Sequence, residues 1–450
     1  MPLQAGDKLG RRGFLSAVAV AAVPARPNIV YIMTDQQHAG MMSCAGNPWL
    51  KTPHMDALAA SGVRFELAYS GNPVCVPART SMMTGRYPSY YGIRNNNVGK
   101  LPDSVLPTAL GHVFRAGGYR TAFGGKTHWP RPMTAESIGF EYIARNERDE
   151  LATECVKFLG QKQDKPFLLI ASFINPHDIC YMAIDAHTKA EGLPMASPKS
   201  VVERECVAAA SRVPAGASVP PLPSNHGPTS SEPGAFTRLT GFRKHVRAHW
   251  SAEEWRLHRW TYCRLTEGVD AQIGRVLAAV DKNTVVIFAS DHGDMDSAHG
   301  FEHKSLPYEE SARVPFIVSW PGRVPAGKVD RKHLVGSTID LFPTLCDFAG
   351  ITPPAGLPGR SVRKLAGWRT DLVIECGDSR TLRTARYKYS IWEGPGTREM
   401  LIDMEKDPGE MKNLAGEAGM AATVAKLRAR LRAEIASRGD KYGESLFAAD

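Results

Sequence analysis

The chain has 450 residues, of which 43% are apolar and 22% charged, and its formal net charge is +9. These values are typical of a globular protein with a large core and exclude a disordered or fibrous chain. The positive charge favours an anionic substrate. Lys and Arg are spread along the sequence, without the basic blocks of nucleic-acid-binding proteins. The eight cysteines include no C-x-x-C pair, which argues against a zinc cluster and leaves at most one disulfide open.

The N-terminus has the features of an export signal. A twin-arginine pattern at Arg11–Leu15 precedes the apolar run Ser16–Val23 and the small residues Val23-Pro24-Ala25. The apolar run is too short to cross a bilayer. The pattern predicts a cleaved signal peptide at residues 1–25 and a periplasmic or secreted bacterial protein without a membrane span.

Apolar runs and amphipathic segments alternate through most of the chain. The predicted strands are residues 28–33, 63–69, 119–123, 166–173, 284–289 and 316–320. The predicted helices are residues 52–61, 75–84, 104–116, 149–163, 251–281 and 338–348. Ser251 and Glu254 form a capping box at the start of the longest one. This alternation predicts an α/β fold with a mostly parallel central sheet flanked by helices.

Two regions differ from this alternation. Periodicity fades across residues 182–250, which we interpret as a surface insertion that shapes the substrate cleft. After a Pro/Gly-rich stretch, segments 372–376, 381–392 and 399–403 read as strands and 420–438 as a helix. We therefore predict a catalytic domain at 26–366. A small C-terminal domain at 367–450 is expected to have an antiparallel sheet and a covering helix.

Polar side chains follow four of the predicted strands. Because parallel strands end at one edge of a sheet, these side chains are expected to form one site there. Turn residues of this kind are individually common, so the inference depends on the whole set. The set consists of Asp35, Lys126, His128, His177, Asp291 and His292.

The segment Cys75-Val76-Pro77-Ala78-Arg79 is predicted to open a helix that ends at Gly85. Pro77 suits the first helical turn, where a missing N–H costs little. Cys75 lies at the N-terminus, where free amides and the helix dipole favour an anion. Arg79 follows one turn later on the same face. By itself the pattern also fits a buried structural cysteine beside a surface arginine.

Together with Thr80-Ser81-Met82-Met83-Thr84-Gly85-Arg86, the segment closely resembles the signature of the type I, formylglycine-dependent sulfatases of the alkaline phosphatase superfamily. Flanking blocks extend the resemblance over most of residues 26–440. The resemblance implies an alkaline-phosphatase-like fold and hydrolysis of a sulfate ester on a small molecule or glycan, with a carbohydrate favoured. It also implies that a formylglycine-generating enzyme, as a transient partner, converts Cys75 to formylglycine.

The resemblance further implies a metal site for one Ca²⁺, with Mg²⁺ or Mn²⁺ as less favoured ions. Its ligands would be Asp35, Gln36, residue 75, Asp291 and His292. The family usually has a second aspartate where this chain has Gln36, which removes one negative charge from the site.

The resemblance also assigns roles in catalysis. Residue 75, as an aldehyde hydrate, would attack sulfur with help from Arg79 and Lys126, and its second hydroxyl would expel sulfate. His128 would be the base for that expulsion, and His177 the acid for the leaving group. The catalytic set is Cys75, Arg79, Lys126, His128, His177 and Lys304.

Two other functions remain open from the sequence. A phosphonate monoester or phosphodiester hydrolase of the same superfamily can share the formylglycine and the metal site. A catalytically silent binding protein is disfavoured, because such a protein would be expected to lose some of five residues that are all present. They are Cys75, Arg79, Lys126, His128 and Lys304. The natural ester and the oligomeric state are not determined by the sequence.

Overall fold

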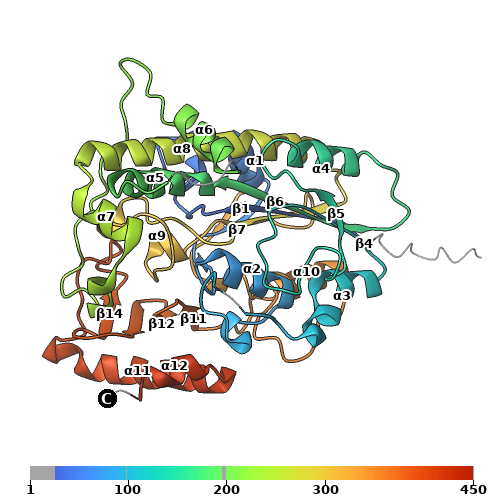
Figure 1. Cartoon of the computed structure of the whole chain (residues 1–450). Coiled ribbons are helices and arrows are strands. Elements are labelled where there is room, and N and C mark those ends of the chain that lie inside the picture. The colour runs from blue at the N-terminus through green and yellow to red at the C-terminus, as the bar shows by residue number, and fades with distance from the viewer. Residues whose placement is uncertain (1–25, 98, 195–198, 449–450) are drawn as a thin grey trace, which may run out of the picture.

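An eight-stranded sheet forms the centre of the computed structural model, in the order β5-β4-β6-β1-β7-β8-β2-β9 (Figure 1). The strands β5, β4, β6, β1 and β7 run parallel, and β8 is antiparallel to both of its neighbours. The predicted mostly parallel sheet is thereby confirmed. The bounds are β1 Asn28–Asp35, β2 Gly62–Phe65, β4 Arg120–Gly125, β5 Glu141–Ala144, β6 Phe167–Pro176, β7 Thr284–Ser290, β8 Phe316–Ser319 and β9 Lys328–Asp330.

The structure describes residues 26–97, 99–194 and 199–448, so the predicted signal peptide lies outside the described residues. Within those ranges no helix is long and apolar enough to cross a membrane. All eight cysteines lie within the described ranges and are free, so the one disulfide left open by the sequence does not form here.

Alternate residues of β1 enter two separate cores, one on each face of the sheet. Ile29 and Tyr31 pack into one cluster, and Val30 and Ile32 pack into the other. Helices cover both faces, as the two helical layers in Figure 1 show. One layer contains α2 Cys75–Thr84, α3 Leu110–Ala116 and α10 Leu341–Ala349, and the other α1 Pro53–Ala60, α4 Leu151–Leu159 and α8 Ala252–Ala278.

The predicted capping box begins α8, where the Ser251 side chain accepts from the Glu254 amide and the Glu254 carboxylate accepts from the Ser251 amide. Two other elements differ from prediction. The expected strand 63–69 is divided into β2 and a short β3, Ala68–Tyr69, which pairs with β10, Val335–Gly336, in a second sheet. The expected helix 104–116 begins as a 3-10 helix, because Pro107 lacks an N–H for the α-helical bond.

The expectation of a long irregular region at 182–250 is only partly correct. The region and its border contain α5 Cys180–Ala190, α6 Lys199–Ala210 and α7 Gly241–His249. In α7 the one fully buried residue is Val246, and Phe242 and Trp250, four residues to either side, pack against the same small cluster. This short stripe at helical spacing is a helix signal that the interpretation of the region as irregular overlooked.

The C-terminal sheet is antiparallel, as predicted. Its strands are β11 Asp371–Glu375, β12 Ser379–Thr384, β13 Tyr387–Trp392 and β14 Glu399–Asp403. One face is covered by α11 Ala421–Arg438, with α12 Lys441–Ser445 beside it. The other face packs against Phe301 and Tyr308, on the loop that leads to α9 Glu309–Ala312, and thereby supports the edge where the polar side chains meet.

Gly125, the last residue of β4, precedes Lys126 and has a backbone conformation and surroundings that leave no room for a side chain. Its φ is +89°, and a Cβ there would lie 2.1 Å from the Ser172 carbonyl oxygen. We expect Gly125→Ala to destabilise the protein by about 2 kcal/mol more than Gly350→Ala, because Gly350 has φ +64° with open space around it. Thermal unfolding of both variants measures the difference, and equal shifts would contradict the predicted clash.

Candidate active site

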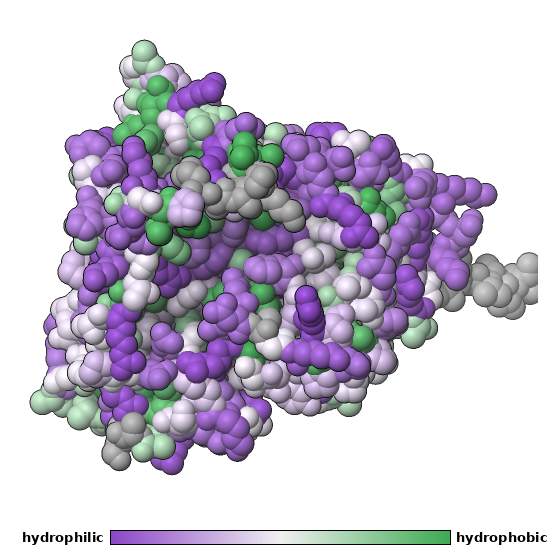
Figure 2. All heavy atoms as spheres, viewed as in Figure 1, coloured by the Kyte–Doolittle hydropathy of each residue, from purple (hydrophilic) through white to green (hydrophobic). Residues whose placement is uncertain are grey.

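The four strand ends singled out in the sequence meet at one edge of the sheet. β1 ends with Asp35, while Lys126, His177 and Asp291 directly follow β4, β6 and β7. The strands are in register there, since Asp35 is paired with Pro176 and Thr34 with Ser290. The predicted convergence of these side chains is therefore correct. On the face seen in Figure 2, the molecule is hollowed between the helical layer with α5 and the C-terminal sheet.

Cys75 is the first residue of α2, and its side chain faces the same edge. All ten residues of α2 are buried, and Gly85 ends the helix in the left-handed conformation, as predicted. The Cys75 Sγ lies 3.0 Å from the Lys304 Nζ and 3.2 Å from the His292 Nε2. It also lies 3.8 Å from the Asp35 Oδ1 and 3.9 Å from the Lys126 Nζ. The cysteine is therefore at the centre of the predicted site.

The charges around Cys75 favour a negative atom at its position. Burial alone would raise the pKa of this thiol, because a thiolate is poorly solvated inside a protein. Lys126, Lys304 and His292 outweigh burial and hold the pKa well below its ordinary value, and His128 adds a hydrogen bond in the same direction. An anionic group is thus stabilised at residue 75 despite its complete burial.

Arg79 holds the two acids of the site. Its Nε donates to the Asp291 Oδ2 at 2.8 Å, and its Nη2 donates to the Asp35 Oδ2 at 3.0 Å. Its Nη1 donates to the Lys126 carbonyl at 2.7 Å, which ties the loop after β4 to α2. All three charged groups of this ion-pair network are buried, so removal of Arg79 would leave two carboxylates poorly compensated. The contacts place Arg79 against the acids rather than against Cys75.

Four side chains form a group that fits a divalent cation. One ligand atom from each of Asp35, Cys75, Asp291 and His292 lies within 4.8 Å of the others. The His292 Nδ1 donates to the Gly293 carbonyl, which leaves Nε2 as the ring atom that faces the acids, 3.6 Å from the Asp35 Oδ1 and from the Asp291 Oδ1. Burial, followed by the charge of Asp35, raises the pKa of Asp291. Two adjacent buried carboxylates and an imidazole are a donor set for a hard divalent cation.

The Gln36 side chain has a different position from the one predicted. Its Oε1 accepts a 2.9 Å hydrogen bond from the Lys304 Nζ, and its Nε2 donates to the Asp294 Oδ2 at 2.7 Å. Both polar ends of the amide are therefore engaged by protein groups. In this arrangement Gln36 orients Lys304 beside Cys75, and the amide oxygen that was predicted to bind the metal accepts a hydrogen bond from this lysine.

The two histidines assigned to proton transfer lie in different environments. Burial, Lys126 and Lys304 lower the pKa of His177 to about 4, so its ring is neutral near pH 7 when no ligand is bound. His128 is exposed, with φ +45°, on the loop after β4. The two rings therefore differ in exposure to solvent and in the charges around them.

Several residues near the site were not found from the sequence. Ser172 in β6 accepts from Arg79, the Tyr262 hydroxyl donates to the Gln36 carbonyl, and Arg243 donates to the Lys304 carbonyl. Tyr262 and Arg243 come from α8 and α7, which reach the sheet edge from distant sequence positions. No local motif marks them, because their position depends on helix packing.

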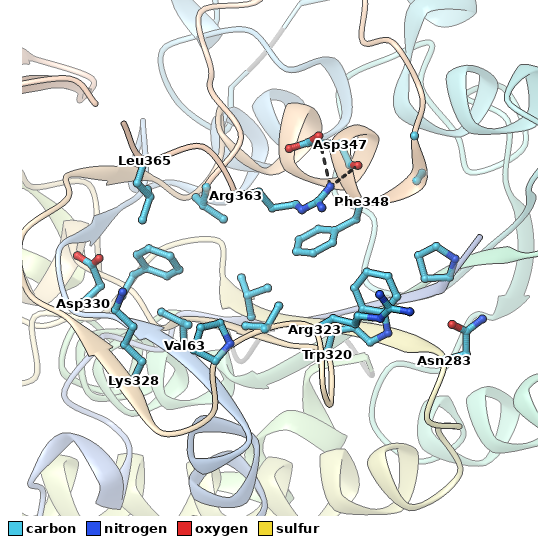
Figure 3. Close-up of a pocket in the computed structure, with 18 of the residues that line it drawn as sticks. Val63, Asn283, Trp320, Arg323, Lys328, Asp330, Asp347, Phe348, Arg363 and Leu365 are labelled. Atoms are coloured by element: carbon cyan, nitrogen blue, oxygen red, sulfur yellow. Dashed lines mark hydrogen bonds and ion pairs between the residues drawn. The ribbon is translucent and has the colours of Figure 1, made fainter. Parts of the chain in front are cut away.

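A second cavity, of about 920 Å³, lies at the opposite edge of the sheet (Figure 3). Phe348 of α10 faces Trp320 and Val63 across it, and Arg363 at its rim is paired with Asp347. Arg26 and Asn283, which precede β1 and β7, also line it. Its lining includes none of the predicted site residues, so this cavity is separate from the catalytic group.

Comparison with known proteins agrees with the site. The family model "Sulfatase" matches residues 27–351, and the model "N-sulphoglucosamine sulphohydrolase, C-terminal" matches residues 297–437. The chain is 30% identical to a Δ4,5-hexuronate-2-O-sulfatase of Bacteroides thetaiotaomicron, over 94% of this chain and 92% of that one. It is 29% identical to an ulvan-active sulfatase of Formosa agariphila, covering 93% and 83%.

Solved structures give the same result. A 2-O GAG sulfatase has a TM-score of 0.79 and 28% identity, with 93% of both chains covered. A phosphonate monoester hydrolase of Agrobacterium radiobacter has a TM-score of 0.70, covering 92% of this chain and 96% of that one, but its 22% identity shows the fold alone. The chain therefore belongs to the sulfatase family of the alkaline phosphatase superfamily and is a sulfuric ester hydrolase.

Proposed function

We propose that this enzyme removes sulfate from a carbohydrate, through formylglycine at residue 75 and one divalent cation, with Ca²⁺ as the expected ion. The observation that carries this proposal is the completely buried position of Cys75, surrounded within 4 Å by Lys126, Lys304, His292 and Asp35. The names of the relatives support the carbohydrate part, since they refer to a hexuronate and to ulvan.

The protein groups around residue 75 are arranged to bind and polarise a sulfate. Asp35, Asp291 and His292 would hold the cation. When bound, the cation would supply Lewis-acid activation. Formylglycine would supply one hydroxyl that attacks sulfur and a second that allows sulfate to leave. Lys126 and Lys304 would hold the sulfate oxygens and stabilise the charge that develops on them.

The substrate itself would prepare His177 to act as the acid. Burial lowers the pKa of this histidine most, and the charges of Lys126 and Lys304 lower it further. A bound sulfate would place negative charge between these two lysines. Binding therefore weakens the field that keeps the ring neutral, so the pKa of His177 rises in the complex. A protonated His177 can then donate to the leaving alcohol, while His128 accepts the proton when sulfate is expelled.

We also propose that residues 1–25 direct export of the folded enzyme through the twin-arginine route to the periplasm or medium. The catalytic unit would be residues 26–366, with 367–450 as its C-terminal domain.

A desulfation screen tests the proposed activity. Sulfated mono- and oligosaccharides, 4-nitrophenyl sulfate and a 4-nitrophenyl phosphonate monoester are compared by release of sulfate, phosphonate or 4-nitrophenol. We expect turnover of at least one sulfated saccharide and much slower turnover of the phosphonate. Turnover of the phosphonate alone would contradict the proposal.

The two histidines are expected to respond differently to substitution. His177→Ala should retain a sizeable fraction of 4-nitrophenyl sulfate turnover but lose sugar sulfate turnover, because nitrophenolate leaves without a proton. His128→Ala should lose both activities and accumulate sulfate on residue 75. Sulfate release and the peptide mass give both readouts. Equal loss of both substrates in His177→Ala, or adduct in that variant, would reverse the assignment.

A further inference from the structure

A positively charged side chain, Arg243, lies beside Lys304, and the proposed sulfate chemistry does not use it. Arg243 belongs to α7, and its Nη2 donates a 2.6 Å hydrogen bond to the Lys304 carbonyl. The Nζ of this lysine lies 3.0 Å from the Cys75 Sγ. Lys304 therefore contacts the guanidinium through its carbonyl and the reacting position through its Nζ.

Arg243 has no acidic partner among the described residues, since no carboxylate oxygen lies within 4.0 Å of its nitrogens. The other arginine of α7, Arg247, is paired with Glu232 at 2.6 Å. Burial lowers the pKa of Arg243, which shows that the cation is poorly solvated. A partly buried cation with one carbonyl partner gains more than an exposed one from an anionic ligand.

Two ring side chains, Phe242 and His303, lie next to Arg243 and Lys304 in the sequence. The rings of Phe242 and His303 are in contact, with centroids 5.2 Å apart. The His303 Nδ1 is buried and lies 3.4 Å from the Glu302 Oε2, without a hydrogen bond of good geometry within the described part of the chain. Burial, Lys304 and Arg243 hold the pKa of His303 well below its usual value, so its ring is neutral and able to contact a sugar hydroxyl.

Glu302 is near Arg243 in space but does not form an ion pair with it. The carboxyl group is almost fully buried, and neither of its oxygens has a hydrogen-bond partner among the described residues. Burial raises the pKa of Glu302 to about 8, despite the opposing charge of Arg243. The carboxyl group is therefore mainly protonated at neutral pH, and Arg243 is left without an ion pair within 4.0 Å among the described residues.

We propose that Arg243 binds a carboxylate on the same sugar that carries the scissile sulfate, so that the preferred substrate is a sulfated uronate. Phe242 and His303 would contact the sugar between the two anionic groups. A planar guanidinium can bind a carboxylate through two parallel hydrogen bonds, which makes the contact selective as well as strong. This inference rests on the proposed function, because it assumes a sulfated sugar at residue 75.

The test compares two substrates that differ only in this charge. The first is 4-nitrophenyl β-D-glucuronide 2-O-sulfate, and the second is its methyl ester. Arg243→Met is expected to lower kcat/KM for the acid by about 100-fold, mainly through KM, and for the ester by less than about 3-fold. Inhibition by glucuronate should weaken in parallel. Lys244→Met, which removes an exposed cation from the same helix, is the matched control and should change neither substrate.

Arg243→Lys separates charge from geometry, because lysine keeps the cation but lacks the planar fork. We expect Arg243→Lys to bring the KM for the acid part of the way back toward the wild-type value. It should not restore the preference for the acid over the ester that two parallel hydrogen bonds would give. Equal losses on acid and ester in Arg243→Met would overturn the carboxylate role and leave the sulfatase assignment intact. If the wild type cleaves another sulfated saccharide but neither glucuronide, this inference fails and the carbohydrate proposal stands. If it cleaves 4-nitrophenyl sulfate but no sulfated saccharide, both fail.

Discussion

Cys75→Ser should lower sulfate-ester turnover by about 1,000-fold or more, and sulfate should remain attached to the new serine. The serine hydroxyl occupies the same anion-stabilising position, between Lys126 and Lys304, so attack on sulfur remains geometrically possible. It lacks the second hydroxyl of an aldehyde hydrate, and the resulting sulfate ester has no internal route to break down. Sulfate release measures turnover, and the mass of the peptide containing residue 75 shows the adduct.

The control for this variant is Cys44→Ser. Cys44 is a partly exposed cysteine near the start of α1, and its substitution should leave turnover unchanged. If Cys75→Ser retains near wild-type turnover, residue 75 does not need the chemistry of an aldehyde hydrate, and the proposed mechanism is wrong.

Asp291→Asn should remove the bound metal ion and the activity together. The Asp291 Oδ1 lies 3.6 Å from the His292 Nε2 and belongs to the group of ligand atoms around Cys75. Neutralising one of only two carboxylates removes half of the acidic charge that would hold a hard cation. We expect a loss of metal from one equivalent to near zero and a fall in turnover of about 1,000-fold. Elemental analysis of the purified protein measures the first and sulfate release the second.

Asp296→Asn is the matched control. Asp296 is buried in the same loop but is paired with Arg259 and is not part of the metal-binding group. That variant should keep its metal. Full activity of the wild type after removal of all divalent metal would contradict the metal assignment, and an ion other than Ca²⁺ in the untreated protein would correct its identity.

The sequence predicted the parts of the site that lie directly after strands. Asp35 and Asp291 follow continuous apolar runs, and parallel pairing brings such ends to one edge. Cys75 was found for a different reason, since its helix start and its motif are both local features. These are short-range patterns, and the fold confirms the positions that they predicted.

Contacts that depend on helix packing could not be predicted in the same way. Gln36 was assigned as a metal ligand from the family resemblance, at the position of a second aspartate, and the structure pairs its oxygen with Lys304. Arg243 lies in a region that was interpreted as a surface insertion, and α7 is positioned by its packing against α5. Sequence spacing gives no information about contacts such as the one between Gln36 and Lys304, because the two residues are far apart in the chain.

The mass of tryptic peptide 65–79 from an active preparation is the most direct test of the central claim. That claim is that the buried, positively charged surroundings of residue 75 hold an aldehyde-derived nucleophile and not a thiol. We predict that the peptide is about 18 Da lighter than its sequence requires, as conversion of a cysteine thiol to an aldehyde demands. An active preparation in which this peptide has the full mass of unmodified cysteine would contradict the account.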